Sequence, residues 1–135
     1  MDNCLFCQII DGKKSAQIVY QNESVVAVLD VFPRSLGHVI VLPRHHVENI
    51  LELSANEMGL VFDGVQTVTK LLKDKLSPHG FTIGINHGKV SGQVIDHLHI
   101  HIIPRFDGDG GGSIHSIVNS PPKESLEEIK NKIIN

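Results

Sequence analysis

Several features that define whole classes of protein are absent from this sequence. Its 135 residues include two cysteines, one tyrosine and no tryptophan. Two cysteines are too few for a disulfide framework, which excludes a small disulfide-stapled fold. No apolar run approaches the roughly 18 residues of a membrane span, and the N-terminus lacks the basic and apolar segments of a signal peptide. We therefore expect a protein of a reducing compartment, the cytoplasm, with no membrane partner.

An excess of positive charge is also absent. Lysine and arginine total 12 against 15 acidic residues, so the formal net charge is -3. Nucleic-acid surfaces need clustered cations, and no nucleic-acid partner is expected. The 41% hydrophobic and 20% charged shares are those of one globular domain. We assign residues 1–106 to the body of this domain and residues 107–135 to a Gly-rich loop and C-terminal helical tail of the same domain.

Local patterns predict an α+β fold with a five-stranded, mostly antiparallel sheet. Short β-branched runs between turn residues indicate strands. Ser54 and Glu57 form a capping box before an apolar stripe at helical spacing, which ends at Ser77-Pro78. We expect one long helix at 54–76, short terminal helices at 4–10 and 124–134, and strands at 17–20, 25–29, 39–42, 81–85 and 97–103.

Histidine is abundant, with nine residues, and three of them alternate with aliphatic residues in the last expected strand. Alternate strand residues point to opposite faces, so the aliphatic side chains would enter an apolar layer. The three imidazoles would share the other face, about 6.6 Å apart at about 3.3 Å per residue. These are His97, His99 and His101. Each imidazole needs hydrogen-bond partners, which argues against a purely packing role.

Three interpretations of this histidine row compete: an exposed sheet face, a metal site, or phosphate chemistry with one imidazole as nucleophile. The preceding segment, residues 86–93, contains two glycines and leads directly toward the row. Its backbone N–H groups could form an anion-binding nest beside the imidazoles. The neighbouring loop therefore favours phosphate chemistry.

The segment 97–103 resembles the His-φ-His-φ-His-φ-φ motif of the histidine triad (HIT) superfamily of nucleotide hydrolases and transferases, where φ is an apolar residue. The resemblance covers residues 4–105 and looks most like the Hint-type and microbial Hit branch. Its other motifs occur in the family's order: Cys4-Leu5-Phe6-Cys7, Leu29-Asp30, Gly37-His38 through Pro43, Asn86, Gly92-Gln93 and Pro104-Arg105. The resemblance implies the HIT-like fold.

The resemblance also implies a mechanism. In this family the middle histidine attacks the α-phosphorus of a nucleotide, and water hydrolyses the resulting nucleotidyl-histidine; His99 takes that position. His101 would donate to the phosphate oxygens, and His38 matches a fourth histidine that tunes the site. A neutral imidazole is a competent nucleophile at pH 7, so this chemistry requires no metal.

The nucleotide-binding residues are carried over in the same way. Asp30 matches the family acid that binds the ribose hydroxyls, and Asn86 a phosphate or ribose contact; a strand-ending turn residue is the alternative for Asn86. Backbone amides of one loop would stabilise the phosphate as in an oxyanion hole: Gly92, Gln93 and Val94. The apolar side chains that would line the base slot are Leu29, Phe6 and Ile9. Core packing explains Phe6 and Ile9 equally well.

Val94 departs from the family pattern. Hint relatives carry Ser and Fhit relatives Thr at this position, where a hydroxyl is thought to help the leaving group. Valine has no such proton, although its backbone N–H is present. The departure puts fast release of a poor leaving group in doubt.

The Cys-x-x-Cys of residues 4–7 fits a redox pair, a metal site or two buried thiols. A redox motif normally follows a strand in a βαβ unit, and none precedes it here. Two thiolates need two further ligands for tetrahedral zinc. Microbial HIT relatives with this N-terminus often bind structural zinc, and the matching ligands here are Cys4, Cys7, His46 and His97.

Together these patterns predict a hydrolase that cleaves purine nucleoside phosphoramidates, conjugates of AMP or GMP, and releases a nucleoside monophosphate. A dinucleoside polyphosphate hydrolase is the alternative enzyme, and a nucleotide-binding regulator or scaffold with incidental hydrolysis is the alternative from another class. The resemblance implies a homodimer joined through the long helix and the following edge strand. That strand, 81–85, carries no Lys, Glu or Pro to block edge pairing.

Overall fold

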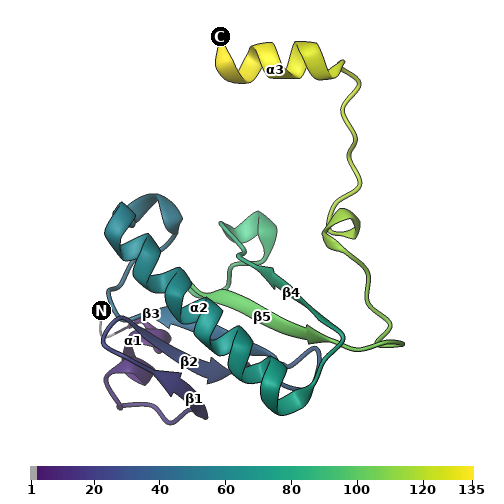
Figure 1. The fold of residues 1–135 in the computed structure, drawn as a ribbon. Coiled ribbons are helices and arrows are strands. Elements are labelled where there is room, and N and C mark those ends of the chain that lie inside the picture. Colours follow the sequence, from purple (N-terminus) through teal and green to yellow (C-terminus); the bar gives the residue numbers. More distant parts are fainter. Residues whose placement is uncertain (1–2) are drawn as a thin grey trace.

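The computed structural model describes residues 3–135, in which five strands form one antiparallel sheet (Figure 1). The strand order is β1-β2-β3-β5-β4, and each neighbouring pair is antiparallel. The edges of the sheet are therefore β1 and β4. The strands are β1 (Ile18–Gln21), β2 (Val25–Leu29), β3 (Val39–Pro43), β4 (Gly80–Gly84) and β5 (Ile100–Arg105). The α+β prediction is confirmed.

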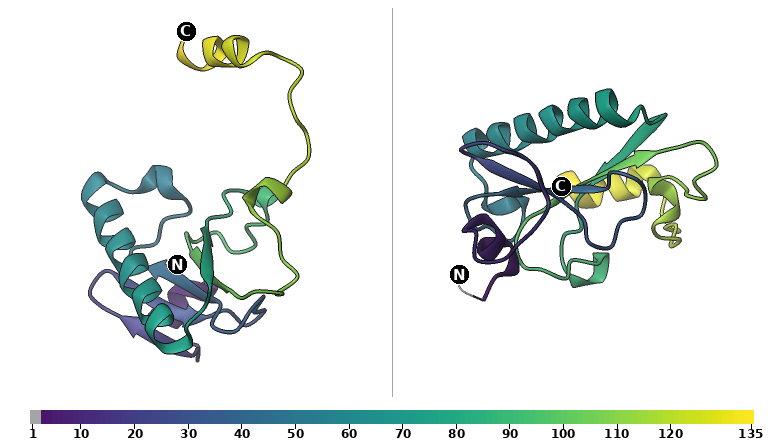
Figure 2. Two further views of the ribbon diagram at one scale, coloured as in Figure 1. Left: turned by 45° about the vertical axis from the view of Figure 1, so that its right-hand side comes forward. Right: turned by 90° about the horizontal axis from the view of Figure 1, so that it is seen from below.

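One long helix, α2 (Ala55–Leu76), covers one face of this sheet (Figures 1 and 2). The expected cap is present, because the Glu57 N–H donates to Ser54 Oγ at 3.1 Å. The helix ends at Leu76, and its C-cap Ser77 adopts a left-handed φ of 50° immediately before a proline. Its apolar stripe is buried against the aliphatic residues that alternate with the histidines, and the stripe comprises Val61, Val65, Val68 and Leu72.

Gly64 allows α2 to approach the sheet closely. A Cβ at this position would lie 2.6 Å from Val25 Cγ2 on β2. Val25 is fully buried and its branched side chain has little rotamer freedom. A glycine is therefore required here by packing, whereas a Cβ on Gly59, in the same helix, would meet open space.

The opposite face carries a second, smaller apolar cluster under α1 (Leu5–Ile10). Phe6 of this helix is buried against residues of β2 and β3, among them Val28 and Ile40. The helix, the sheet and α2 thus form three layers, seen edge-on in the right-hand view of Figure 2. The imidazole rings of His97 and His99 pack on Phe6, so they lie on the α1 side.

The last strand begins later than the pattern predicts. Strand β5 starts at Ile100, so His97, Leu98 and His99 precede the ladder instead of belonging to it. The Leu98 N–H donates to the Val47 carbonyl, outside the sheet, at 2.7 Å. The predicted division of faces is nevertheless confirmed. Leu98, Ile100 and Ile102 pack with α2, while the rings of His99 and His101 lie 5.1 Å apart.

Two short 3-10 turns, η1 (Ile50–Glu52) and η2 (Lys89–Ser91), flank the central elements. After β5, Arg105 and Asp109 form a two-bond ion pair at 2.7 and 3.0 Å, which organises the Gly-rich loop. The chain then passes through η3 (Ile114–Ser116) to α3 (Leu126–Ile134), which stands apart from the sheet and α2 (Figures 1 and 2). The assignment of residues 107–135 to the same domain stays a prediction.

Candidate functional site

His99 is held with one defined nitrogen available for chemistry. Its Nδ1 lies 2.8 Å from the backbone carbonyl oxygen of His97, and a carbonyl only accepts, so Nδ1–H donates. The neutral ring must then carry its lone pair on Nε2. Phe6 packs edge-on against the ring, with centroids 5.0 Å apart, and only 8% of His99 is exposed. This is the tautomer that an attack through Nε2 requires.

His101 is oriented by a chain of hydrogen bonds that begins in the loop after β2. The Arg34 N–H donates to His38 Nδ1 at 3.1 Å, which leaves the His38 proton on Nε2. That Nε2 lies 2.9 Å from His101 Nδ1 and donates to it. The neutral His101 ring therefore carries its own proton on Nε2, where it can donate to an anion.

The pKa values of both rings keep them neutral near pH 7. Burial lowers the pKa of His101 to about 4, with His99 and His38 adding to the shift and Asp30 opposing it. Burial also lowers the pKa of His38, again against the opposing charge of Asp30. Neutral rings preserve the donor–acceptor chain just described.

Asp30 lies beside this histidine pair. Its Oδ2 is 3.4 Å from His38 Nε2 and 3.7 Å from His101 Nδ1, and its Oδ1 accepts from the Phe32 N–H at 2.8 Å. Leu29, at the end of β2, is 39% exposed next to it. The predicted ribose ligand thus stands at the His101 end of the histidine row.

Two of the three predicted amide donors are already engaged. The Gly92 N–H donates to the Lys89 carbonyl at 3.0 Å and the Gln93 N–H to the Gly88 carbonyl at 3.2 Å. Both bonds close the turn around η2, so these amides hold the loop instead of pointing to a ligand. The Val94 N–H makes no such bond within residues 3–135.

The Gln93 side chain fastens this loop to the rest of the protein. It is 8% exposed, its Oε1 accepts from the Gly88 N–H at 2.8 Å, and its Nε2 donates to the Glu48 carbonyl at 2.8 Å. Asn86 lies against Gly92, about 3.7 Å from where a Cβ would stand. The side-chain hydrogen bonds of Gln93 are therefore made within the protein and hold this loop in place.

The predicted base-slot residues fall into different environments. Phe6 is buried in the cluster under α1, and Ile9 packs against that cluster half-buried. Two further apolar side chains follow Asp30 and were not singled out by the sequence pattern. They are Val31 and Phe32, 81% and 82% exposed. Their signal was an apolar pair directly after the candidate ribose ligand in a proline-containing turn.

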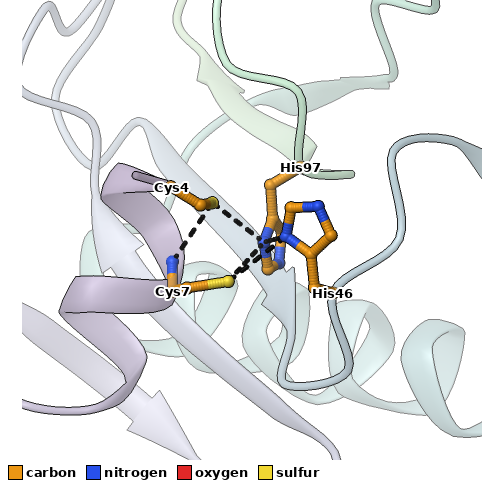
Figure 3. A group of neighbouring side chains, drawn as sticks. All are labelled: Cys4, Cys7, His46 and His97. Carbon is orange, nitrogen blue, oxygen red and sulfur yellow. Dashed lines mark hydrogen bonds between the residues drawn. The ribbon is translucent and has the colours of Figure 1, made fainter. Parts of the chain in front are cut away.

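The four predicted metal ligands converge between α1 and the start of the histidine row (Figure 3). Their ligand atoms all lie within 4.8 Å of one another: Cys4, Cys7, His46 and His97. His45, next to His46 in sequence, points away and contacts Glu57 at 3.1 Å. Folding therefore brings together residues from three separate segments.

The spacing of these atoms fits tetrahedral zinc. Bonds of about 2.0 Å to nitrogen and 2.3 Å to sulfur place ligand atoms about 3.3 to 3.8 Å apart. His46 Nδ1 lies 3.2 Å from His97 Nδ1 and 3.2 Å from Cys7 Sγ. His97 Nδ1 lies 3.5 and 3.6 Å from the Cys4 and Cys7 sulfurs.

The protonation of His97 agrees with a ligand role. Its Nε2–H donates to the Pro43 carbonyl at 2.8 Å, which leaves the Nδ1 lone pair facing the cysteines. Burial lowers the pKa of His97 to about 4, so the ring is neutral. Burial and the Cys4 side chain raise the pKa of the Cys7 thiol to about 11 in the metal-free chain, so a metal has to displace that proton.

Comparison with known proteins decides the family. Residues 11–108 match the HIT domain family. The chain belongs to the HIT family. An uncharacterised HIT-like protein of Methanocaldococcus jannaschii is 41% identical over 94% of this chain and 98% of its own length. The adenosine 5′-monophosphoramidase hnt1 of Schizosaccharomyces pombe is 30% identical over 97% of this chain and 98% of its own.

Solved HIT structures share the fold. A HIT family protein of Bacillus anthracis superposes with a TM-score of 0.85 at 32% identity, covering 98% of this chain and 93% of its own. A zinc-bound histidine triad protein of Mycobacterium smegmatis gives 0.75 at 25% identity, covering 96% and 89%. The chain is accordingly a HIT protein of the nucleotide-hydrolase type. No helix within residues 3–135 has the length and hydrophobicity to cross a membrane.

Proposed function

We propose that this HIT protein hydrolyses purine nucleoside phosphoramidates to a nucleoside monophosphate and an amine. The observation that carries the proposal is the fixed tautomer of His99, whose ring centroid lies 5.1 Å from that of His101, a ring with its own proton on Nε2. A nucleophile next to a hydrogen-bond donor is the minimum that phosphoryl transfer through a covalent intermediate requires. The phosphoramidase name of the fission-yeast relative supports the choice of bond.

The proposed reaction has two displacements. His99 Nε2 attacks the α-phosphorus, an N–P bond to the ring forms, and the substrate's P–N bond breaks as the departing amine takes a proton from water. The hydroxide left by that water then attacks the same phosphorus and the N–P bond to the ring breaks, which releases the nucleoside monophosphate and restores the neutral His99 ring. His101 Nε2–H and the Val94 N–H donate to the phosphate oxygens, where negative charge builds up.

The nucleoside part is assigned to the Asp30 end of the row. The Asp30 carboxylate accepts hydrogen bonds from the ribose hydroxyls, and Asn86 is a further polar contact. The side chains beside the base are Leu29, Phe6 and Ile9. The exposed pair Val31 and Phe32 adds apolar surface suited to a purine. Adenosine and guanosine conjugates are both compatible with this assignment.

We further propose a structural zinc held by Cys4, Cys7, His46 and His97. The distances and the His97 tautomer support it, and the zinc-bound mycobacterial structure is a precedent within the family. When bound, the metal ties α1 to the segment that carries His99, and the chemistry does not pass through it. Cytoplasmic residence, which keeps thiol ligands reduced, belongs to the same proposal.

A homodimer through α2 and β4 is also proposed. Strand β4 is a sheet edge, and apolar side chains on both elements are exposed in the single chain: Leu60 at 44%, Phe62 at 42% and Ile83 at 39%. The C-terminal helix α3 does not lie over α2 (Figure 1). Light scattering at micromolar concentration tests this: twice 14.8 kDa supports the dimer, and 14.8 kDa contradicts it.

Turnover of two substrate classes tests the proposed activity. Adenylylated lysine-type phosphoramidates should be hydrolysed with a higher kcat/KM than diadenosine polyphosphates. The reverse order would favour the dinucleoside polyphosphate hydrolase. Tight nucleotide binding with negligible turnover of both would favour the regulator, the alternative that the missing hydroxyl at Val94 supports.

A further inference from the structure

A cavity of about 760 Å³ opens beside the first histidine of the row, and Val94 is the one residue of its wall that the nucleotide assignment above uses. Its walls come from the N-terminal segment, the residues after β3 and the segment leading to His97. They comprise Asn3, Cys4, Leu5, His46, Glu48, Val94, Ile95 and Asp96. Gln93 makes this wall rigid, because its Nε2 donates to the carbonyls of both Glu48 and Ile95, at 2.8 and 3.2 Å.

The cavity and Asp30 lie at opposite ends of the histidine row. Asp30 contacts His101, the last histidine, at 3.7 Å. The cavity includes His46 and Cys4, which contact His97, the first histidine, at 3.2 and 3.5 Å. His99, the proposed nucleophile, stands between the two ends. In-line attack by His99 expels the leaving group on the side of the phosphorus away from Nε2, and with the nucleoside toward Asp30 the cavity at the His97 end is the space open to that group.

The loop that ends at Val94 also borders the cavity. Val94, whose N–H is the amide proposed to meet the phosphate, is 86% exposed and lines the wall. A group leaving the phosphorus on this side would enter the cavity without crossing the nucleoside site.

The lining of the cavity combines aliphatic surface with negative charge. Leu5, Val94 and Ile95 offer apolar contact, while Glu48 and Asp96 add two exposed carboxylates. Neither carboxylate forms an ion pair in the part of the chain that the structure describes. Among residues 3–135, no lysine or arginine is part of the wall. Such a wall attracts a cation and repels a polyphosphate.

We infer that this cavity is the leaving-group site and that it selects amines with an aliphatic chain and a second, distal positive charge. The inference rests on the proposed function and names its substrate class. The chain of the amine lies against Leu5, Val94 and Ile95, and its distal ammonium lies near Glu48 and Asp96. An anionic leaving group such as a nucleotide meets these carboxylates unfavourably.

Matched substrates isolate the charge of the leaving group. AMP linked to diaminopropane and AMP linked to butylamine have the same length and differ in a terminal ammonium against a methyl group. For the unmodified protein we expect the cationic substrate to have a kcat/KM roughly three- to tenfold higher at low salt, the range for exposed charges several ångströms apart. Salt should reduce this ratio.

One double variant and one control complete the test. In Glu48→Gln/Asp96→Asn the ratio should fall to about one while turnover of the butylamine substrate is kept. In Asp63→Asn, which removes an exposed carboxylate from α2, the ratio should not change. Equal rates in the unmodified protein, or a preference that survives the double substitution, would overturn the inference and leave the phosphoramidase activity standing. Turnover of neither substrate would overturn both.

Discussion

His38 Nε2 lies 2.9 Å from His101 Nδ1, although 63 residues separate them in sequence. Because the Arg34 N–H already occupies the other nitrogen of His38, this contact has only one direction, from His38 to His101. It fixes the proton of His101 on Nε2. We therefore propose that His38 acts through His101 as a positioning residue.

The burial of His101 predicts a loss of stability in acid. Its pKa is about 4 in the folded protein and about 6.5 in an unfolded chain, so the unfolded state binds more protons between these values. The free energy of unfolding should thus fall as the pH drops from about 6.5 toward 4, by at most roughly 3 kcal/mol from this residue.

Urea unfolding at several pH values tests this effect. In His101→Gln the decrease in the free energy of unfolding between pH 6.5 and 4 should be smaller than in the unmodified protein, because the titrating imidazole is gone. The zinc ligands are present in both proteins, so their effect cancels in this comparison. His115→Gln, which removes an exposed histidine from the tail, should behave like the unmodified protein. Identical pH dependence in His101→Gln would contradict the assignment.

The two glycines of α2 should respond oppositely to alanine. Gly64→Ala forces a Cβ against Val25 and should destabilise the protein by about 1–3 kcal/mol. Gly59→Ala meets open space and should stabilise it by about 0.5–1 kcal/mol through helix propensity. Chemical denaturation gives the free energy of unfolding of both variants. Equal changes in the two would contradict the close packing of α2 on β2 at Gly64.

Loss of the metal should affect stability more than catalysis. Metal analysis of protein never exposed to chelator should give about one zinc per chain. Cys7→Ser should lower the melting temperature by more than about 10 °C, while activity at 20 °C falls much less. His45→Ala, beside the site but outside it, serves as the control and should keep both metal and stability. A Cys4–Cys7 disulfide in the purified protein would contradict the site.

Most of the fold could be predicted from local sequence patterns. The Ser54 cap, the stripe of α2 and the alternation around His99 are set by residues near one another in sequence, and the structure agrees with all three. The start of β5 was predicted three residues too early, because strand pairing depends on which partner is available. Leu98 bonds to Val47 instead of to a strand.

The site was less accessible to sequence reasoning. The histidine row left three interpretations open and its glycine-containing neighbour favoured phosphate chemistry, whereas Asp30, His38 and the full set of metal ligands came from the family resemblance. Nothing local indicates that the amides of Gly92 and Gln93 close their own turn, since this depends on the φ of 102° at Gly92 and on the conformation of η2. The tautomers of the histidines follow only from their three-dimensional partners.

The measurement that tests the central claim most directly is detection of the covalent intermediate on His99. The protein would be mixed with an AMP phosphoramidate, quenched in alkali within the first turnover and examined by peptide mass spectrometry. We predict one nucleoside monophosphate attached to the peptide that contains His99, and in His99→Ala no adduct and a loss of several powers of ten in kcat with AMP binding retained. Normal turnover in His99→Ala, or an adduct on another residue, would contradict the account.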